Sequence, residues 1–297
     1  MDQKLDVLLV GPWERVLKDR GLQSISNYVQ ALKLKEFIGK VIYSSSDPKG
    51  TVPLDIFDSV VSTYRGVKIP TSYQNGNTSY ATSKSEFSPY IENVKAGLKY
   101  CSAKFIIRIR SDLELKEIEE IFFLLTKYPQ KIFIDYHPEH SLLIPFYYSD
   151  MFLAARATSV YSLYKGDFKR NSVGKKKLSF NPFKYLSAGF WDAAYQHPEV
   201  LFWFNALKNI EYIKKNYTFA NIFYVFQSLI IINKKIILLD RNRVFVLHQR
   251  FNLSHNWNNK LIFPWKFSIY SRLIIKHLFK FYNKSFYNLI NKISNLY

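Results

Sequence analysis

Short apolar runs alternate with amphipathic stretches through the first half of this chain, and this alternation restricts the possible folds more than any other feature. Residues 6–10 form a compact apolar run that stops at Gly11-Pro12, as expected of a buried strand that ends in a turn. Residues 24–34 then place apolar side chains at helical spacing. Further strand-like runs cover residues 40–43, 59–64, 104–109 and 132–135. The pattern predicts an α/β protein with an open, mostly parallel sheet flanked by helices.

Three further segments have recognisable patterns. Residues 73–89 are rich in Ser, Thr, Asn and Gly and are expected to form a long loop. Residues 114–128 carry apolar side chains on one face, which predicts an amphipathic helix. Pro198-Glu199 is expected to open another helix, running to about residue 214, because proline and an acid both favour a first helical turn.

The division of the chain follows from its length and its charge. The 297 residues suffice for one large α/β domain with a helical appendage. The formal net charge of +19 is concentrated at the end, because no Asp or Glu follows Asp240 whereas ten Lys and Arg do. We therefore expect residues 1–240 to form the main domain and residues 241–297 a basic, amphipathic, helical C-terminal region.

This basic region predicts a peripheral membrane contact. Arg272, Lys276, Lys280 and Lys284 recur at every fourth residue, so on a helix they form one basic stripe, with apolar side chains largely beside or opposite it. Such a helix suits an anionic membrane surface. The pattern fits equally well a helix whose apolar face packs on the main domain.

The cellular compartment is indicated by what the sequence does not contain. A single cysteine, Cys101, excludes an intramolecular disulfide and a cysteine-rich zinc site, which fits a reducing cytosol. The N-terminal residues do not have the pattern of a signal peptide, and no window reaches the roughly 18 apolar residues of a spanning helix. The expected location is cytoplasmic, on the inner face of the cytoplasmic membrane.

Polar residues follow three of the expected strands. These clusters are Gly11-Pro12, the serines Ser44 and Ser45, and Arg110-Ser111-Asp112. In open α/β sheets ligands bind outside the carboxyl ends of the strands, so the three clusters are expected to face one crevice. Such a set suits a sugar nucleotide, since backbone and hydroxyl groups can bind the base and ribose. Arginine can bind the diphosphate.

Asp112 is the candidate ligand for a divalent cation, Mn²⁺ or Mg²⁺, which it would hold against the diphosphate. A different role for Asp112 is to cap the helix expected to begin near residue 113 or 114. The two roles are compatible only if the carboxylate also faces the crevice.

Two other acids are candidates for catalysis. Asp150 interrupts the apolar stretch 141–155, where a carboxylate must find partners or shift its pKa, and a structural hydrogen-bonding role fits equally. Glu199 follows Pro198 in a first helical turn, where acids are common. The sequence has no Walker A loop, GxGxxG motif, nucleophile elbow or HExxH motif, which argues against nucleotide hydrolysis, dinucleotide redox chemistry, serine hydrolysis and zinc proteolysis.

Taken in order, the motifs over roughly residues 5–240 resemble the WavE-type lipopolysaccharide synthesis family, bacterial proteins regarded as glycosyltransferases with a GT-A-like fold. Two departures from the family pattern stand out: Ser88-Pro89-Tyr90 replaces its usual Asn-Arg-Gln, and Arg108 replaces its usual Lys. The segments that carry the resemblance are Val10-Gly11-Pro12, Ser44-Ser45, 93–99, 107–113, 144–152 and His197-Pro198-Glu199.

The resemblance implies transfer of a sugar, expected to be a hexose, from a nucleotide donor to a lipopolysaccharide, lipooligosaccharide or capsule acceptor. The departing diphosphate would be stabilised by a cation at Asp112 and by Arg108 or Arg110. An inverting reaction also needs a carboxylate base, for which Asp150 and Glu199 are the candidates. The acceptor would be a lipid-linked molecule or an oligosaccharide.

Two other functions fit parts of the sequence. Its charge and its Tyr and Phe residues interleaved with Lys would suit nucleic-acid binding, but no RRM, KH or helix-turn-helix signature supports such a partner. A non-catalytic scaffold of polysaccharide assembly is the other alternative, and assays of donor hydrolysis distinguish it from an enzyme.

Overall fold

The structure, a computed structural model, describes residues 3–64, 83–136, 148–149, 151–166, 198–210, 228, 230–232 and 234–246. Its elements in chain order are β1 (Leu5–Val10), α1 (Trp13–Asp19), α2 (Leu22–Lys33), β2 (Ile38–Ser45), β3 (Ser59–Ser62), α3 (Ser83–Leu98), β4 (Phe105–Arg110), β5 (Glu114–Leu115), α4 (Ile118–Lys127), β6 (Ile132–Tyr136), β7 (Phe152–Arg156), α5 (Ala157–Tyr164), α7 (Pro198–Asn209), β8 (Ile236–Asp240), α9 (Arg241–Val244) and β9 (Phe245–Val246).

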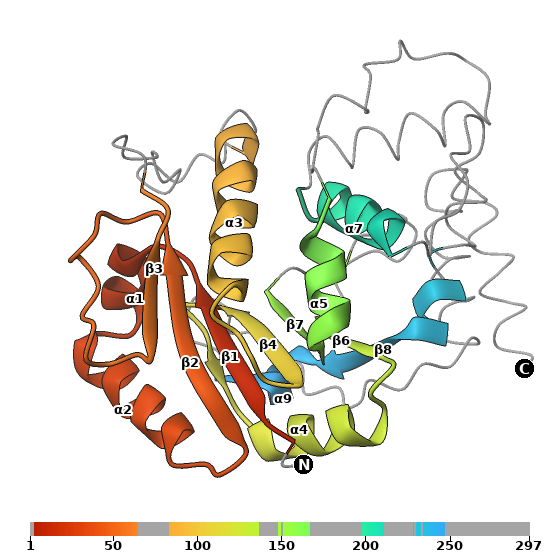
Figure 1. Cartoon of the computed structure of the whole chain (residues 1–297), viewed down its shortest axis with the longest axis horizontal. Helices are drawn as coiled ribbons and strands as arrows, with labels where there is room; N and C mark the ends of the chain where they lie inside the picture. Colours follow the sequence, from red (N-terminus) through yellow and green to blue (C-terminus); the bar gives the residue numbers. More distant parts are fainter. Residues whose placement is uncertain are drawn as a thin grey trace, which may run out of the picture.

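Seven of the strands form one sheet in the order β3-β2-β1-β4-β7-β6-β8 (Figure 1). Strands β1 to β4 are parallel, as are β6 and β8, whereas β7 is antiparallel to both of its neighbours. From β1 the chain builds β2 and β3 on one side and later β4 on the other, so the strand order switches between β1 and β4. The sheet confirms the expected fold class.

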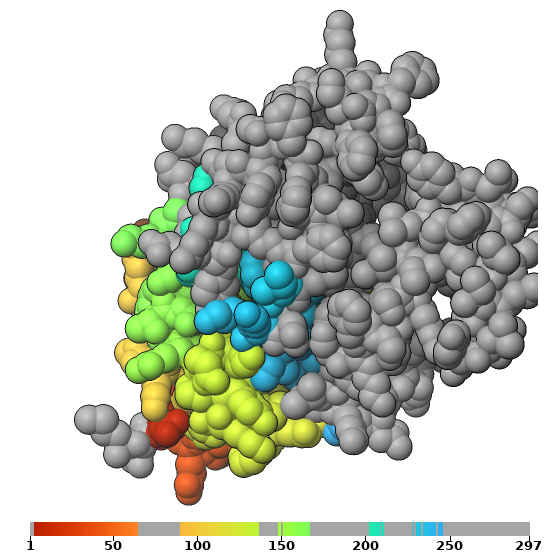
Figure 2. Space-filling view, turned by 90° about the vertical axis from the view of Figure 1, so that its right-hand side faces the viewer, coloured from red at the N-terminus to blue at the C-terminus, as the bar shows by residue number. Residues whose placement is uncertain are grey.

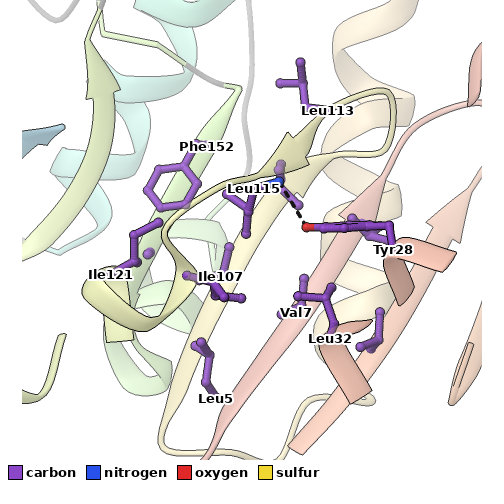
Figure 3. Packing of buried hydrophobic residues seen from close by; sticks show 14 of the residues in the cluster. Leu5, Val7, Tyr28, Leu32, Ile107, Leu113, Leu115, Ile121 and Phe152 are labelled. Carbon is purple, nitrogen blue, oxygen red and sulfur yellow. Dashed lines mark hydrogen bonds between the residues drawn. The ribbon is translucent and has the colours of Figure 1, made fainter. Parts of the chain in front are cut away.

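Helices cover both faces of this sheet because the strands are apolar on both sides. Buried side chains of α3, α5 and α7 form one core, and those of α1, α2 and α4 form the other. Figure 3 shows the second core, where Leu32 of α2 and Ile121 of α4 lie over Val7 and Ile107 of the sheet. The described part of the chain is thus a three-layer arrangement of helix, sheet and helix.

Gly97 allows α3 to pack closely on the sheet. A Cβ atom at this position would lie 2.4 Å from Cδ1 of Leu8 and 3.0 Å from Cβ of Ser44, which is too close for unchanged packing. The glycine belongs to one of the segments that resemble the WavE-type family. Its physical role is to bring α3 onto the ends of β1 and β2.

Two sequence predictions are wrong at their boundaries. Residues 114 and 115 form β5 rather than the start of a helix, and α4 begins only at Ile118. The strand pairs with β9, so partners far away in the sequence override the local helical pattern. Helix α3 begins at Ser83, so residues 83–89 are not part of a loop, while residues 73–82 lie outside the described residues.

The expected boundary between residues 240 and 241 stays a prediction. On its far side, residues 241–246 form α9 and β9, and residues 247–297 lie outside the described part of the chain. Among the helices that the structure describes, none has both the length and the hydrophobicity needed to cross a membrane.

Candidate functional site

The carboxyl ends of β1, β2 and β4 lie side by side at the switch in strand order. Val10 is paired with Ser44 on one side and with Arg110 on the other. Beyond the paired residues, the Gly11 amide donates to the Ser44 carbonyl at 3.2 Å, and the Ser111 amide donates to the Val10 carbonyl at 3.0 Å. All three polar clusters are therefore neighbours at one edge of the sheet, the place where open α/β sheets bind ligands.

Gly11 and Pro12 turn the chain across the end of β1. Gly11 has a φ of +151°, and a Cβ atom there would lie 2.5 Å from Oγ of Ser111, so this position requires glycine. The Tyr43 hydroxyl donates to the Gly11 carbonyl at 2.8 Å, and the Trp13 amide donates to Oδ2 of Asp47 at 2.7 Å. Asp47, rather than Pro12, thus satisfies the first amide of α1.

The hydroxyls of Ser44 and Ser45 are buried and used inside the protein. Oγ of Ser44 donates to the Asn93 carbonyl in α3 at 2.7 Å, and Oγ of Ser45 accepts from the Asp47 amide at 3.2 Å. The structure thus gives both serines a role in joining β2 to its surroundings. Their contact with a nucleotide stays a prediction.

Arg110 and Asp112 form a two-point ion pair at the end of β4. Nε of Arg110 donates to Oδ1 of Asp112 at 3.0 Å, and Nη2 donates to Oδ2. Burial by itself raises the pKa of the Asp112 carboxyl, but the adjacent Arg110 and the charge of Arg15 on α1 lower the pKa below its ordinary value of 3.8. Asp112 is therefore ionised at neutral pH.

Arg20 holds the segment that follows Asp112. Its fully buried side chain donates to the Leu113 carbonyl at 3.2 Å and to Oε2 of Glu114 at 3.0 Å, and its guanidinium lies 4.6 Å from the centre of the Tyr28 ring. The Tyr28 hydroxyl accepts from the Leu115 amide at 3.1 Å (Figure 3). Asp112 is therefore followed by a fixed segment, and it does not cap a helix.

The C-terminal described segment holds the other side of residues 114–117. The Lys116 amide donates to the Val244 carbonyl at 2.8 Å, and Arg243 forms an ion pair with Glu117 at 2.6 Å. Figure 2 shows the surface of this segment, in blue, adjoining that of the α4 region, in yellow-green. The sequence gives no sign of the contacts of Arg15, Arg20 and Arg243, because single basic residues carry no signal of their long-range partners.

Arg108 lies deeper than Arg110. It is on β4, two residues before Arg110, its side chain is fully buried, and its guanidinium lies 5.6 Å from the centre of the Tyr90 ring of α3. The structure thus brings Arg110 to the edge of the sheet and places Arg108 in the interior. A phosphate contact by Arg108 stays a prediction.

Because β7 is antiparallel, it begins at the same edge of the sheet. The Arg110 amide donates to the Met151 carbonyl at 3.0 Å, so the residue that follows Asp150 lies directly beside the backbone of Arg110. Asp150 itself lies outside the described residues. Glu199 is in the first turn of α7, as expected, although this helix ends at Asn209 rather than near residue 214.

A second group of polar residues surrounds Ser149, two residues before Met151. Arg241 forms a buried ion pair with Asp135, and it also donates to Oγ of Ser149 at 3.0 Å. The Ser149 carbonyl accepts from Nε1 of Trp203 at 3.0 Å. Neither Asp135 nor Arg241 was identified from the sequence, because the two residues are 106 positions apart.

The residues that the structure describes do not by themselves fit a metal site. Nowhere among them do three His, Cys, Asp or Glu side chains gather closely enough to hold an ion. Asp112 offers one carboxylate, and both of its oxygens bind Arg110, which a cation would have to displace. Asp112 as a metal ligand therefore stays a prediction.

By its sheet and the position of its site, the protein is an α/β protein with a mostly parallel sheet and a candidate ligand site at the switch in strand order. No protein-family model matches the sequence, and no curated protein sequence matches it either.

Several solved structures are similar to this one. TarS from S. aureus has a TM-score of 0.40 and 10% identity, covering 82% of this chain and 36% of that chain, so this chain spans about a third of it. The 4-diphosphocytidyl-2C-methyl-D-erythritol synthase of Anaerococcus prevotii has a TM-score of 0.37 and 11% identity, and the match covers 84% of this chain and 95% of that chain. Mouse xyloside xylosyltransferase 1 has a TM-score of 0.33 and 14% identity, and the match covers 70% of this chain and 81% of that chain. We therefore infer the function from the residues of the site.

Proposed function

We propose that the protein is a glycosyltransferase that transfers a hexose from a nucleotide-sugar donor. The acceptor is a lipopolysaccharide, lipooligosaccharide or capsule chain, as expected for the WavE-type family that its motifs resemble. The observation that carries the proposal is the ion pair of Arg110 and Asp112 at the switch in strand order, beside the backbone of Gly11 and Ser44. This is where an α/β sheet offers polar groups to a nucleotide.

Arg110 supplies the positive charge for the donor diphosphate. Its planar guanidinium suits two-point contact with phosphate oxygens, and Asp112 holds it in place at the edge of the sheet. During transfer the bond between the anomeric carbon and the diphosphate oxygen breaks, and the electron pair stays on the diphosphate. Arg110, with the nearby charge of Arg15, stabilises the negative charge that develops there.

The acceptor side is assigned to Asp150 and Glu199. In an inverting reaction the acceptor oxygen bonds to the anomeric carbon, and its proton passes to a carboxylate. We favour Asp150 as this base because Met151, the next residue, is bound to Arg110. Glu199 then orients the substrate from the first turn of α7.

Mn²⁺ or Mg²⁺ at Asp112 is the cation expected from the family resemblance. In the described residues Asp112 is paired with Arg110, so the proposal assigns neutralisation of the diphosphate to arginine.

A panel of UDP-, GDP-, CDP- and ADP-sugars tests the function directly. We expect slow hydrolysis of one nucleotide class in the absence of acceptor, and loss of this hydrolysis in Asp112→Asn. Each reaction is run with Mn²⁺, with Mg²⁺ and with EDTA, and activity that survives EDTA supports charge neutralisation by arginine. If the folded protein neither binds nor hydrolyses any of these donors, the proposed transfer is contradicted and a non-catalytic role is favoured.

Membrane attachment through the basic C-terminal region is the second part of the proposal. Anionic headgroups contribute about 1 kcal/mol per nearby cation. Arg272, Lys276, Lys280 and Lys284, which lie outside the described residues, would therefore strengthen membrane binding by roughly three powers of ten. We expect deletion of residues 264–297 to abolish sedimentation with phosphatidylglycerol vesicles and to leave donor hydrolysis intact.

Three results would contradict this attachment. An unfolded truncated chain would show that the region packs on the main domain. An intact chain that ignores the vesicles at low salt would remove the membrane contact. Salt-sensitive binding of random oligonucleotides without vesicle binding would favour the nucleic-acid alternative.

A further inference from the structure

Ser149 is the meeting point of three segments that are distant in the sequence. Its Oγ accepts from Nη2 of Arg241 at 3.0 Å and from the Met151 amide at 3.2 Å, and its carbonyl accepts from Nε1 of Trp203 at 3.0 Å. Arg241 in turn donates through Nε to Oδ2 of Asp135 at 2.6 Å. The start of β7 is thus fastened to β6, to α9 and to α7.

This junction is buried and charged. Arg241 is 5% exposed, Ser149 is 2% exposed and Asp135 is fully buried. Among the described residues, Oδ1 of Asp135 has no hydrogen-bond partner, so this carboxylate depends on Arg241. A buried ion pair gains little net stability over an apolar pair, but its directional contacts restrict the geometry around it. The ion pair of Arg241 and Asp135 therefore restrains Ser149, which lies near the site.

The residues on both sides of residue 150 are held by hydrogen bonds. On one side Ser149 is held by Arg241 and Trp203, and on the other the Met151 carbonyl accepts from the Arg110 amide at 3.0 Å. Trp203 also stands four residues after Glu199, one turn further along α7. The two acids assigned to the acceptor side therefore both belong to segments that meet at Ser149.

We propose that Arg241 is a positioning residue for the acceptor side of the site. Arg241 acts through the segments that contain Asp150 and Glu199 and does not touch the substrate. The inference rests on the proposed function. A base must stand within about 3 Å of the proton that it accepts, and a displacement of 1 Å can lower the rate by about 10²-fold. Loosening the junction therefore slows transfer, while the donor contact of Arg110, which Asp112 holds in place, remains.

A matched pair of variants on the same short helix tests the role. Arg241→Lys keeps the charge and loses the two-point contact, and Arg243→Lys does the same at a half-buried ion pair with Glu117. Arg241→Lys is expected to lower kcat for transfer by about 10- to 100-fold. Its Kd values for UDP, GDP, CDP and ADP should stay within about twofold, and Arg243→Lys should change neither quantity by more than about twofold.

Ser149→Ala provides a second, milder variant, because it removes only the hydroxyl that Arg241 and Met151 share. If Arg241→Lys does not fold, as judged by thermal melting, Ser149→Ala decides. The expected result is again a lower kcat with unchanged nucleotide affinity. A parallel fall of kcat and nucleotide affinity in either variant would show a general structural role and overturn the proposal, as would unchanged kinetics.

A double-mutant cycle shows whether the effect passes through the base. In an Asp150→Asn background the second change, Arg241→Lys, is expected to lower kcat by less than about twofold, because the base is already absent. Full additivity would overturn the proposal. Failure of the proposed function is distinguishable, because in that case the unaltered protein itself transfers no sugar.

Discussion

Asp112→Asn is expected to lower the rate of sugar transfer at least about 10²-fold in a protein that still folds. The change preserves the shape of the side chain and removes the charge that orients Arg110, so the diphosphate loses its principal stabilising contact. Initial rates with the donor identified in the panel measure the loss. Near-normal turnover in a folded Asp112→Asn protein would contradict the assignment.

Stability against pH is an independent check on this ion pair. Because the pKa of Asp112 is lowered in the folded protein, its contribution is fully present above the ordinary value of 3.8 and is lost as the pH falls through the lower folded value. Denaturant unfolding at several pH values should therefore show Asp112→Asn to be less stable at neutral pH, by about 1–3 kcal/mol. The difference between the two proteins should shrink in acid.

Asp150→Asn is expected to lower kcat by about 10²- to 10⁴-fold, the usual contribution of a general base. The affinity for the donor nucleotide should not change, because Arg110 and Asp112 are intact. The acidic limb of the pH–rate profile should disappear, since that limb reports ionisation of the base. Glu199→Gln should have a smaller effect on kcat and should keep the acidic limb.

The same comparison can reverse the assignment. If Asp150→Asn leaves both kcat and the pH–rate profile unchanged while Glu199→Gln removes the acidic limb, Glu199 is the base. Asp55→Asn, at an exposed position outside the helices and strands, controls for the change from acid to amide.

The amino-acid sequence by itself determined the strands and the places where they end. Apolar runs stopped by Gly11-Pro12 or by Arg110-Ser111-Asp112 are local signals, and parallel strands necessarily bring their carboxyl ends to one edge. The start of α7 at Pro198 followed in the same way from the preferences of a first turn. Local periodicity failed at residues 114–115, where partners from the end of the described chain form a strand.

Only the tertiary structure decided which side chains meet. From the sequence, Arg108, Arg110 and Asp112 were three separate candidate ligands. The structure pairs Arg110 with Asp112 and buries Arg108 in the interior, away from the edge of the sheet. Arg241 and Asp135 pair across 106 positions, a contact that no local pattern encodes. Long-range pairs of this kind depend on the order and direction of the strands, and here the antiparallel β7 brings Met151 beside Arg110. The strand ends are local properties of the chain, whereas the constellation at the sheet edge exists only once the sheet has assembled.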